Sequence, residues 1–245
     1  MESRRQIWKR LLNEIITNGY DHHKDDNPIR EIIGVHEFIP NLFVDAAYPI
    51  ALDYETTVDW ISKGFADIPE YPIKGEALAD YVSSITDAYM IDGGDFVYTY
   101  PERLCNYITV DLFGDIIEEC NQLKLMANRL QHNKGSNRSV AVLYSPGRDG
   151  VAEDIPCLNW LQALIRKDEY TGRDKLTLSV MFRSNDCYGA WPSNMLFLTC
   201  LGIYLTDILR KEYPDLSFNG IDYHCSSLHI YKTDMDAVNK ILSKE

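Results

Sequence analysis

The sequence lacks any CxxC pair, any apolar run long enough to span a membrane and any excess of basic residues. Its cysteines lie apart, with no spacing typical of zinc ligands or a disulfide framework: Cys105, Cys120, Cys157, Cys187, Cys200 and Cys225. His22 and His23 are adjacent, and the His224-Cys225 pair has no second ligand pair nearby in sequence. The pattern therefore predicts reduced thiols and no metal site.

Net charge and hydropathy limit the kinds of partner that the protein can bind. The 24 Lys and Arg residues against 37 Asp and Glu residues give a net charge of -13, which disfavours nucleic acid and anionic membrane surfaces. The longest apolar segment, 195–205, is short and is followed by Asp207 and Arg210, so a buried helix is expected. The amino terminus, MESRRQIWKRLL, interrupts its apolar residues with charge, unlike a secretion signal. We expect a cytoplasmic protein, in the host cytoplasm if a phage encodes it.

Apolar spacing predicts a mixture of helices and strands in one α+β domain, residues 1–245, without repeats or linkers. Helices are expected at 7–16, closed by a left-handed Asn18-Gly19 stop, at 116–130, at 195–211 and near the carboxyl terminus. Strands are expected in EIIGVHEFI, SVAVLYS, LTLSVMF and SSLHIYK. The run after Cys157 fits either a helix or a strand.

Cys157, in EDIPCLNW, is the first candidate for chemistry. It follows a proline at the mouth of a loop, and a thiol needs cationic neighbours such as Arg138 or Arg183 to become a thiolate nucleophile. The alternative is an inert, buried cysteine.

Arg183 and Ser184 end an alternating strand, and a guanidinium fork with a hydroxyl suits a phosphate monoester. The alternative is a surface arginine paired with Asp186. Arg138, in the loop GSNRSV, is a second phosphate candidate, or simply a solvated loop residue.

Asn194 lies near the start of an expected helix, where it either caps the helix or pairs with a pyrimidine edge through its carboxamide. His229 and Tyr231 are two residues apart on a strand and so share a face. They either hold a sugar hydroxyl together or form a half-buried cross-strand pair.

These residues occur in an order that resembles the thymidylate synthase family, including its phage-type nucleotide hydroxymethylase branch. The resemblance extends over essentially the whole chain and is densest after Ser136. The matching segments are IREIIG (29–34), SNRSVAV (136–142), IPC (155–157), RSND…WPSN (183–194) and SLHIY (227–231).

The resemblance implies a fold with a large mixed sheet at a homodimer interface, flanking helices and active sites shared between subunits. It implies that a cysteine thiolate, here Cys157, adds to carbon 6 of a pyrimidine nucleoside monophosphate. Carbon 5 then takes a one-carbon unit from methylenetetrahydrofolate.

The family's remaining site residues map onto this sequence position by position. Arg183, Ser184 and a partner-donated Arg138 would hold the phosphate, and Lys24 lies near the place of an amino-terminal phosphate arginine. His229 and Tyr231 would hold the sugar hydroxyl. The aspartate that contacts the pyrimidine ring and the tyrosine that assists proton removal map to Asp186 and Tyr100.

The asparagine at position 194 suits uracil, whereas the deoxycytidylate hydroxymethylases carry aspartate there, so dUMP is the expected substrate. Charge that develops on the ring oxygen needs a fixed donor, the role expected of Asn194. The family's catalytic glutamate stands three residues before a tryptophan, but here Thr57 precedes Trp60 by three. Glu55 and Asp59 are the candidate general bases.

Several departures favour hydroxymethylation over methylation. Leu158 replaces the histidine after the cysteine of synthases, Phe182 replaces a glutamine, and the carboxyl-terminal KILSKE lacks an apolar closing segment. A more open site lets water trap the methylene group. The expected product is 5-hydroxymethyl-dUMP. The alternatives are synthesis of dTMP, hydroxymethylation of dCMP or CMP, and a nucleotide-binding homologue without catalysis.

Overall fold

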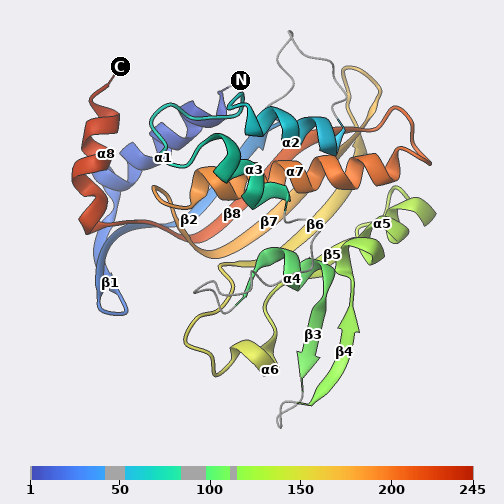
Figure 1. The fold of residues 1–245 in the computed structure, drawn as a ribbon, viewed down its shortest axis with the longest axis horizontal. Coiled ribbons are helices and arrows are strands. Elements are labelled where there is room, and N and C mark those ends of the chain that lie inside the picture. Colours follow the sequence, from blue (N-terminus) through green and yellow to red (C-terminus); the bar gives the residue numbers. More distant parts are fainter. Residues whose placement is uncertain (1, 42–52, 84–97, 111–114, 245) are drawn as a thin grey trace.

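The computed structural model describes residues 2–41, 53–83, 98–110 and 115–244. A mixed six-stranded sheet is its central element (Figure 1). In spatial order its strands are β1 (Tyr20–Lys24), β2 (Asn27–Pro40), β8 (Ser217–Tyr231), β7 (Asp174–Asp186), β6 (Leu158–Lys167) and β5 (Val140–Val142). The β7–β8 pair is parallel and the other pairs are antiparallel.

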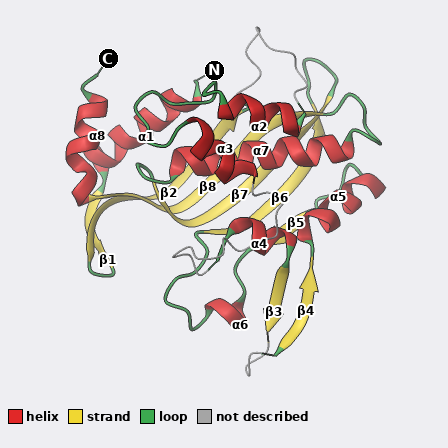
Figure 2. Cartoon of the chain, in the orientation of Figure 1, coloured by secondary structure: helices red, strands yellow, loops and turns green. Residues whose placement is uncertain are grey.

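Helices pack on one face of this sheet, and the chain also forms a small hairpin (Figure 2). The hairpin consists of β3 (Tyr107–Val110) and β4 (Ile116–Cys120). The helices are α1 (Arg4–Asn18), α2 (Tyr54–Ser62), α3 (Gly75–Ser83), α4 (Tyr100–Cys105), α5 (Gln122–His132), α6 (Pro146–Asp149), α7 (Trp191–Leu209) and α8 (Met235–Leu242), with a short 3-10 turn at Lys232–Asp234.

Helix α7 forms the centre of the core. It is apolar on all sides, as expected for a buried helix, and packs on β7 and β8. In the described part of the chain it is the one helix long and apolar enough to cross a membrane, and 78% of that apolar window is buried inside the protein. This confirms the buried helix predicted from the sequence.

The sheet has one buried and one open face. Along β7, Val180 and Phe182 are fully buried while Met181 between them is 39% exposed, and Val140 and Val142 are exposed on either side of the buried Ala141. Phe38 on β2 is also exposed. These open-face residues give the sheet a partly apolar surface that the described helices leave uncovered.

Two sequence predictions were wrong in detail. Residues 116–120 form strand β4 rather than the start of a helix, because the Asn121 side chain accepts the Lys124 amide and begins α5 there. Gly19, which ends α1, is extended rather than left-handed. A glycine is needed there because a Cβ atom would lie 2.4 Å from the Ile15 carbonyl oxygen.

Candidate active site

Cys157 lies immediately before β6, beside the end of β7. Its carbonyl accepts the Arg183 amide at 2.9 Å, while Arg183 Nε and Nη2 donate to the carbonyls of Pro156 (3.1 Å) and Ile155 (2.7 Å). Arg183 is therefore bound to the cysteine loop and not, as the alternative supposed, to Asp186. Two of the five guanidinium N–H groups are used in this way, and the remaining N–H groups can bind an anion.

Parallel pairing of β7 with β8 brings the next residues together. Ser184 aligns with Ser227, and Asp186 aligns with His229. Ser184 Oγ lies 3.4 Å from His229 Nδ1. His229 is fully buried, and its Nε2 has no hydrogen-bond partner among the described residues. A buried polar atom without a partner indicates a place for a ligand group, such as a sugar hydroxyl.

The His229 ring is neutral near pH 7. Burial lowers its pKa to about 4, and the cationic charges of Lys24 and Arg183 act in the same direction. A neutral imidazole offers one donor and one acceptor nitrogen, as a hydroxyl partner requires.

Tyr231 and Lys24 extend the cluster toward the β1–β2 hairpin. Lys24 Nζ donates to Tyr231 Oη at 3.2 Å and lies 5.6 Å from the ring centroid. The Tyr231 ring meets His229 edge-on, with centroids 5.2 Å apart. The predicted shared placement of His229 and Tyr231 is thus seen, with Lys24 beside them.

Asp186 is held by a tight turn. Its Oδ1 accepts the amides of Tyr188 and Gly189, both at 3.0 Å. Burial is the main influence on its carboxyl and raises the pKa above the ordinary value. Gly189 is required here, because a Cβ atom would lie 2.4 Å from Asp186 Oδ2.

Asn194 lies within the first turn of α7 and is 6% exposed. It does not cap the helix. Its Oδ1 accepts the Tyr81 hydroxyl at 2.9 Å, and its Nδ2 donates to Asn185 Oδ1 at 3.2 Å. Asn185 Nδ2 in turn donates to Tyr223 Oη at 3.1 Å. The carboxamide is therefore oriented, with one lone pair and one N–H left for a ligand.

Sequence reasoning missed the three residues that orient Asn194. Tyr81, Asn185 and Tyr223 come from α3, β7 and β8. Asn185 lies inside the RSND segment and could have been noticed by its place between Ser184 and Asp186. The two tyrosines carry no local signal, because only packing brings their hydroxyl groups to this network.

Aromatic rings lie beside the cysteine. The Cys157 amide donates to Tyr98 Oη at 3.3 Å. Tyr100 contacts Phe182 and Phe197, with ring centroids 6.5 and 5.9 Å apart. Burial raises the pKa of the Tyr100 hydroxyl well above its ordinary value. The Tyr100 side chain is therefore a neutral phenol near pH 7.

Arg138 does not join this cluster within one chain. Val140 pairs with Gln162, so the loop before β5 lies about seven residues along β6 from Cys157, or roughly 20 Å at the rise of a strand. The Arg138 backbone amide donates to Ser136 Oγ, and the Arg138 guanidinium has no hydrogen-bond partner among the described residues. An Arg138 that contacts a nucleotide at Cys157 must therefore come from another chain.

The two candidate bases also lie outside the cluster. Glu55 and Asp59 are exposed on α2, and Asp59 pairs with Lys63. The Tyr54 amide donates to Asp207 at 2.6 Å, which places the start of α2 near the end of α7. Asp207 lies roughly 20 Å along α7 from Asn194 at the rise of a helix. The structure thus gives neither carboxylate a contact with the cysteine.

Leu158 and Phe182, the two departures from the synthase pattern, lie next to each other in the structure. The two residues are register partners on β6 and β7, and both are fully buried. Asn159, next in the chain, donates its Nδ2 to the Pro156 carbonyl at 2.8 Å. An apolar pair therefore stands behind Cys157 where synthases have polar side chains.

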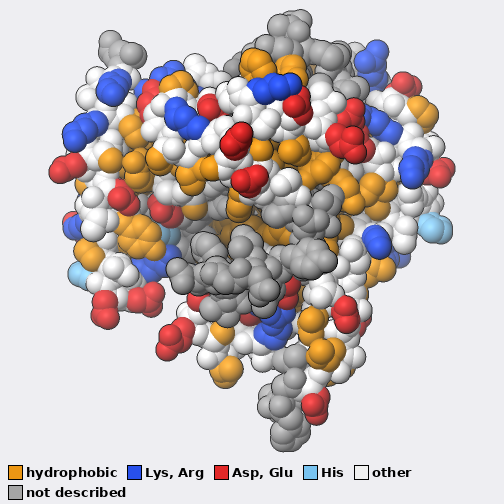
Figure 3. All heavy atoms as spheres, in the orientation of Figure 1, with side chains coloured by type: hydrophobic (Ala, Val, Ile, Leu, Met, Phe, Trp, Pro, Cys, Tyr) orange, Lys and Arg blue, Asp and Glu red, His pale blue; other side chains and the backbone are white. Residues whose placement is uncertain are grey.

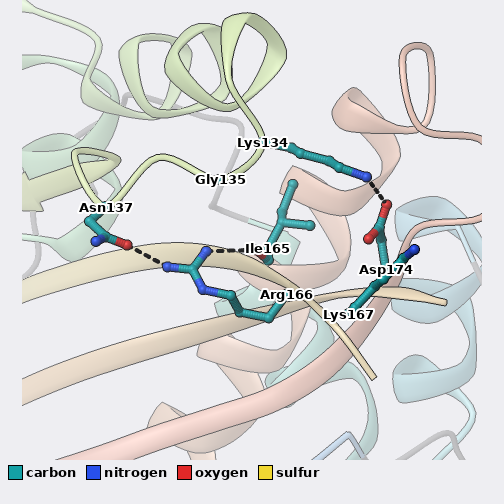
Figure 4. A pocket seen from close by; sticks show the side chains of 7 residues that line it. All are labelled: Lys134, Gly135, Asn137, Ile165, Arg166, Lys167 and Asp174. Atoms are coloured by element: carbon teal, nitrogen blue, oxygen red, sulfur yellow. Dashed lines mark hydrogen bonds and ion pairs between the residues drawn. The ribbon is translucent and has the colours of Figure 1, made fainter. Parts of the chain in front are cut away.

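A pocket of about 480 Å³ lies elsewhere, at the far end of β6. Figure 4 shows Arg166 bonded to Asn137, and Lys134 paired with Asp174, along its wall. It is close to the Arg138 loop but distant along β6 from Cys157. The pocket is therefore separate from the cysteine cluster.

Charge on the molecular surface is mixed. On the face drawn in Figure 3, Lys and Arg side chains are dispersed among Asp and Glu side chains. That face shows no basic patch of the kind that binds nucleic acid.

The fold and the cluster define an α+β protein with a candidate thiol nucleophile beside guanidinium, hydroxyl, imidazole and carboxamide groups. The family model described as thymidylate synthase matches residues 6–245. A protein of Methanocaldococcus jannaschii named "Putative thymidylate synthase" is 29% identical over 220 residues, covering 84% of this chain and 90% of the relative. One of the same name from Methanothermobacter marburgensis is 28% identical over 237 residues, covering 96% and 93%.

The chain therefore belongs to the thymidylate synthase family. It is a one-carbon transferase that acts on pyrimidine nucleotides, in a family that uses methylenetetrahydrofolate as the one-carbon donor. The predicted family and fold are confirmed. Neither of these two names describes a hydroxymethylase, so the branch is a separate question.

Proposed function

We propose that this enzyme converts dUMP to 5-hydroxymethyl-dUMP through a covalent adduct of Cys157. The observation that carries the proposal is the cluster around Cys157, with the unpartnered, buried His229 Nε2 and the oriented Asn194 carboxamide. Each group in it has a counterpart in a pyrimidine deoxynucleotide.

The phosphate and sugar would lie at one end of this cluster. The free N–H groups of Arg183, the Ser184 hydroxyl and the Lys24 ammonium give cations and donors for the phosphate. His229 Nε2 and the Tyr231 hydroxyl, on rings whose centroids lie 5.2 Å apart, would share the sugar hydroxyl. These contacts fix the base over the thiol, which lowers the entropic cost of addition.

The base would meet Cys157 and Asn194. The thiolate forms a bond to carbon 6, and the displaced electron pair moves through carbon 5 toward the carbonyl oxygen at carbon 4. The free Asn194 N–H stabilises that negative charge, while its free lone pair accepts the ring N–H. The network of Tyr81, Asn185 and Tyr223 holds the carboxamide in this orientation.

The residues beside the cysteine fit the one-carbon donor. Tyr98 and Tyr100 offer aromatic rings of the kind that a flat pterin packs against, while the Asp186 carboxyl would contact the pyrimidine ring of the nucleotide. When bound, methylenetetrahydrofolate supplies a one-carbon unit at the oxidation level of formaldehyde. Tyr100 would assist removal of the carbon 5 proton.

Hydroxymethylation consumes one water and leaves tetrahydrofolate, so it needs no hydride. The fully buried apolar pair of Leu158 and Phe182, next to Cys157, supports release of a hydroxymethyl product. Methylation to dTMP is the second candidate, favoured by the names of the relatives.

The open sheet face and the position of Arg138 support a homodimer with shared sites. Arg138 lies too far along β6 to reach its own cysteine, and the exposed Phe38 and Met181 give the open face apolar area for a partner. We infer that residues 1–245 form one domain, because buried residues from α1 through α8 belong to one core cluster.

Product analysis tests the reaction. The protein is incubated with methylenetetrahydrofolate and, separately, dUMP, dCMP, UMP or CMP, and the nucleotides are identified by mass spectrometry. We expect 5-hydroxymethyl-dUMP and tetrahydrofolate. A product of dTMP with dihydrofolate would establish methylation instead, and a hydroxymethyl product from a cytosine nucleotide alone would refute the choice of uracil.

Replacement of the cysteine tests the covalent step. Cys157→Ser removes the thiolate and should lower turnover by at least about 1,000-fold while nucleotide binding persists, since the serine hydroxyl is scarcely ionised. Cys120→Ser on β4 is the matched control and should keep full turnover. Unchanged turnover in Cys157→Ser contradicts the adduct.

A further inference from the structure

A buried ion pair joins α4 to α6 beside the cysteine cluster. Arg103 on α4 and Asp149 on α6 are 2% and 4% exposed. Arg103 Nη2 donates to Asp149 Oδ1 at 2.7 Å, and Arg103 Nη1 donates to Asp149 Oδ2 at 3.1 Å. Arg103 Nη1 also donates to the Leu143 carbonyl at 3.3 Å, and Asp149 Oδ2 accepts the Ser145 amide at 2.6 Å. The pair therefore fixes α4 against the segment that leads from β5 into α6.

A second ion pair adjoins the first and balances its charges. Arg148 Nη1 donates to Glu102 Oε1 at 2.8 Å, and Glu102 Oε2 lies 3.3 Å from Arg103 Nε. Glu102 is 4% exposed. A well-packed apolar pair is often as stable as a buried ion pair, so the charges are not needed for stability alone. What a bidentate guanidinium–carboxylate pair adds is a fixed orientation of the two elements that carry it.

The helix held by these pairs carries aromatic residues that line the cysteine. Tyr100 is the first residue of α4. Arg103 Cζ lies 5.9 Å from the Tyr98 ring centroid, within the range of a cation–π contact, and Tyr98 Oη accepts the Cys157 amide at 3.3 Å. Burial is the main cause of the raised pKa of the Tyr100 hydroxyl, and the nearby Tyr81 hydroxyl and Cys157 thiol act in the same direction. The buried ion pair is thus linked to the cysteine through Tyr98 and through α4.

We propose that the Arg103–Asp149 pair is a positioning element for removal of the carbon 5 proton. By holding α4, the pair keeps the hydroxyl groups of Tyr98 and Tyr100 at Cys157, while neither charged group touches the nucleotide. This inference rests on the proposed roles of Cys157 and Tyr100. A displacement of α4 by about 1 Å slows the chemical step by up to about 100-fold. The phosphate and sugar contacts come from other elements and stay intact.

Two variants weaken the pair without changing the net charge of the buried cluster. Arg103→Lys keeps the cation but replaces the planar fork with a single ammonium group. Arg103→Gln combined with Asp149→Asn removes one cation and one anion together, and it leaves an acceptor for the Ser145 amide. Val238→Ala, at a buried position on α8, is the control for a loss of stability away from this cluster. Urea unfolding of each variant gives the fraction that is folded in the assay.

The isotope effect on proton removal separates positioning from a loss of folded enzyme. A nucleotide labelled with tritium at carbon 5 releases the label into water whether the product is methylated or hydroxymethylated. We expect kcat to fall about 10-fold in Arg103→Lys and at least about 30-fold in the double variant, with the nucleotide Kd within about 3-fold of the parental value. The tritium isotope effect should increase in both variants, because proton removal becomes slow relative to the other steps. Val238→Ala should keep the parental isotope effect, since unfolding lowers only the concentration of active enzyme.

The reactivity of the Cys157 thiol provides a second readout that needs no turnover. Each protein is treated with iodoacetamide, and mass spectrometry of the peptide that contains Cys157 gives the rate of alkylation. We expect this rate to be at least about 3-fold higher in the double variant, because Tyr98 and Tyr100 then cover the thiol less closely. Val238→Ala should react at the parental rate.

The outcomes distinguish this inference from the proposed function. Slower turnover with an increased isotope effect and unchanged nucleotide binding supports the positioning role. Parental kcat per folded enzyme with a parental isotope effect in the double variant overturns it. A parent that releases no tritium contradicts the proposed reaction instead, and the alkylation rates then decide: a faster rate in the double variant supports the positioning role, and an equal rate overturns it. If the double variant does not fold, Arg103→Lys is used for both measurements.

Discussion

The Asn194 carboxamide illustrates how single residues set the chemistry of this site. It is buried at the start of the most apolar helix, where an unsatisfied amide would be costly. Tyr81 and Asn185 satisfy one half of its hydrogen-bonding capacity and leave the other half for a base. In the proposed complex, the identity of this residue determines which pyrimidine edge fits.

Exchange of this carboxamide for a carboxylate should change the preferred base. Asn194→Asp can accept from the amino group of cytosine but cannot donate to the uracil oxygen. We expect the ratio of kcat/KM for dCMP over dUMP to rise by roughly 100-fold. Asn128→Asp on α5 adds the same charge at an exposed position and should leave the ratio unchanged; an unchanged ratio in Asn194→Asp would remove the argument for uracil.

The buried His229 makes stability depend on pH. Its pKa is about 4 in the folded chain and near 6.5 when unfolded, so the unfolded chain binds more protons between these values. The contribution of His229 to the free energy of unfolding is fully present above pH 6.5 and decreases as the pH falls toward 4.

His229→Gln should lose this dependence. Between pH 7 and pH 4 the parent should lose about 3 kcal/mol through this group, roughly 6 to 12 °C of Tm at this chain length, and the variant should not. Thermal unfolding at a series of pH values measures the difference. His132→Gln, at an exposed position, should keep the parental profile, and a parental profile in His229→Gln would mean that another group titrates.

The close packing of α7 on β8 is one of the interactions between elements that position the site. Asn194 occupies one end of α7, and β8 carries His229 and Tyr231. Along their contact a Cβ atom on Gly202 would lie 2.1 Å from Cε2 of the buried Phe218 ring. Glycine at position 202 therefore lets the helix approach the strand.

Gly202→Ala should separate the two elements. Alanine gains about 1 kcal/mol of helix propensity, but overpacking against a buried ring costs about 1 to 3 kcal/mol, and a contact this short places the cost at the upper end. We expect a net loss of about 1 to 2 kcal/mol in urea unfolding at fixed protein concentration. Gly135→Ala, whose Cβ would meet Asn133 Oδ1 at an ordinary 3.4 Å, is the control; equal midpoints would show that the ring moves aside freely.

Local patterns determined some elements and misjudged others. Strand β7 was predictable because its buried and exposed residues alternate, and α7 because its apolar run is long. Residues 116–120 suggested a helix because Ile116, Ile117 and Cys120 have helical spacing, yet they pair with β3 and leave both isoleucines exposed. Spacing alone does not show which neighbour a short apolar segment will contact.

At the scale of the whole molecule, we propose a homodimer in which the open sheet face of one chain packs against the same face of its partner. Arg138 links this dimer to activity, because its loop lies about 20 Å along β6 from the cysteine of its own chain and can reach only the cysteine of a partner. A site complete only with a partner residue would make activity depend on association.

Mixed dimers test this sharing. Arg138→Gln and Cys157→Ser are each expected to be nearly inactive alone. If Arg138 acts on the partner's site, a heterodimer has one intact site and one with both defects, so random mixing should restore about a quarter of parental activity. Steady-state turnover after co-refolding or co-expression measures this. No recovery would place Arg138 in its own chain's site, and Arg129→Gln, exposed on α5, should keep full activity.

The sequence by itself determined the family, the mixed α+β class and most residues of the candidate site, because Cys157, Arg183, Ser184, Asn194, His229 and Tyr231 lie in short segments with fixed spacing. The tertiary structure decided how they are held. It showed Arg183 bound to the cysteine loop, the carboxamide network through Tyr81 and Tyr223, and the exposed positions of Glu55 and Asp59. It also paired His36 with His224 across 188 positions of sequence. Such contacts come from strand register and helix packing, which join residues that no local pattern relates.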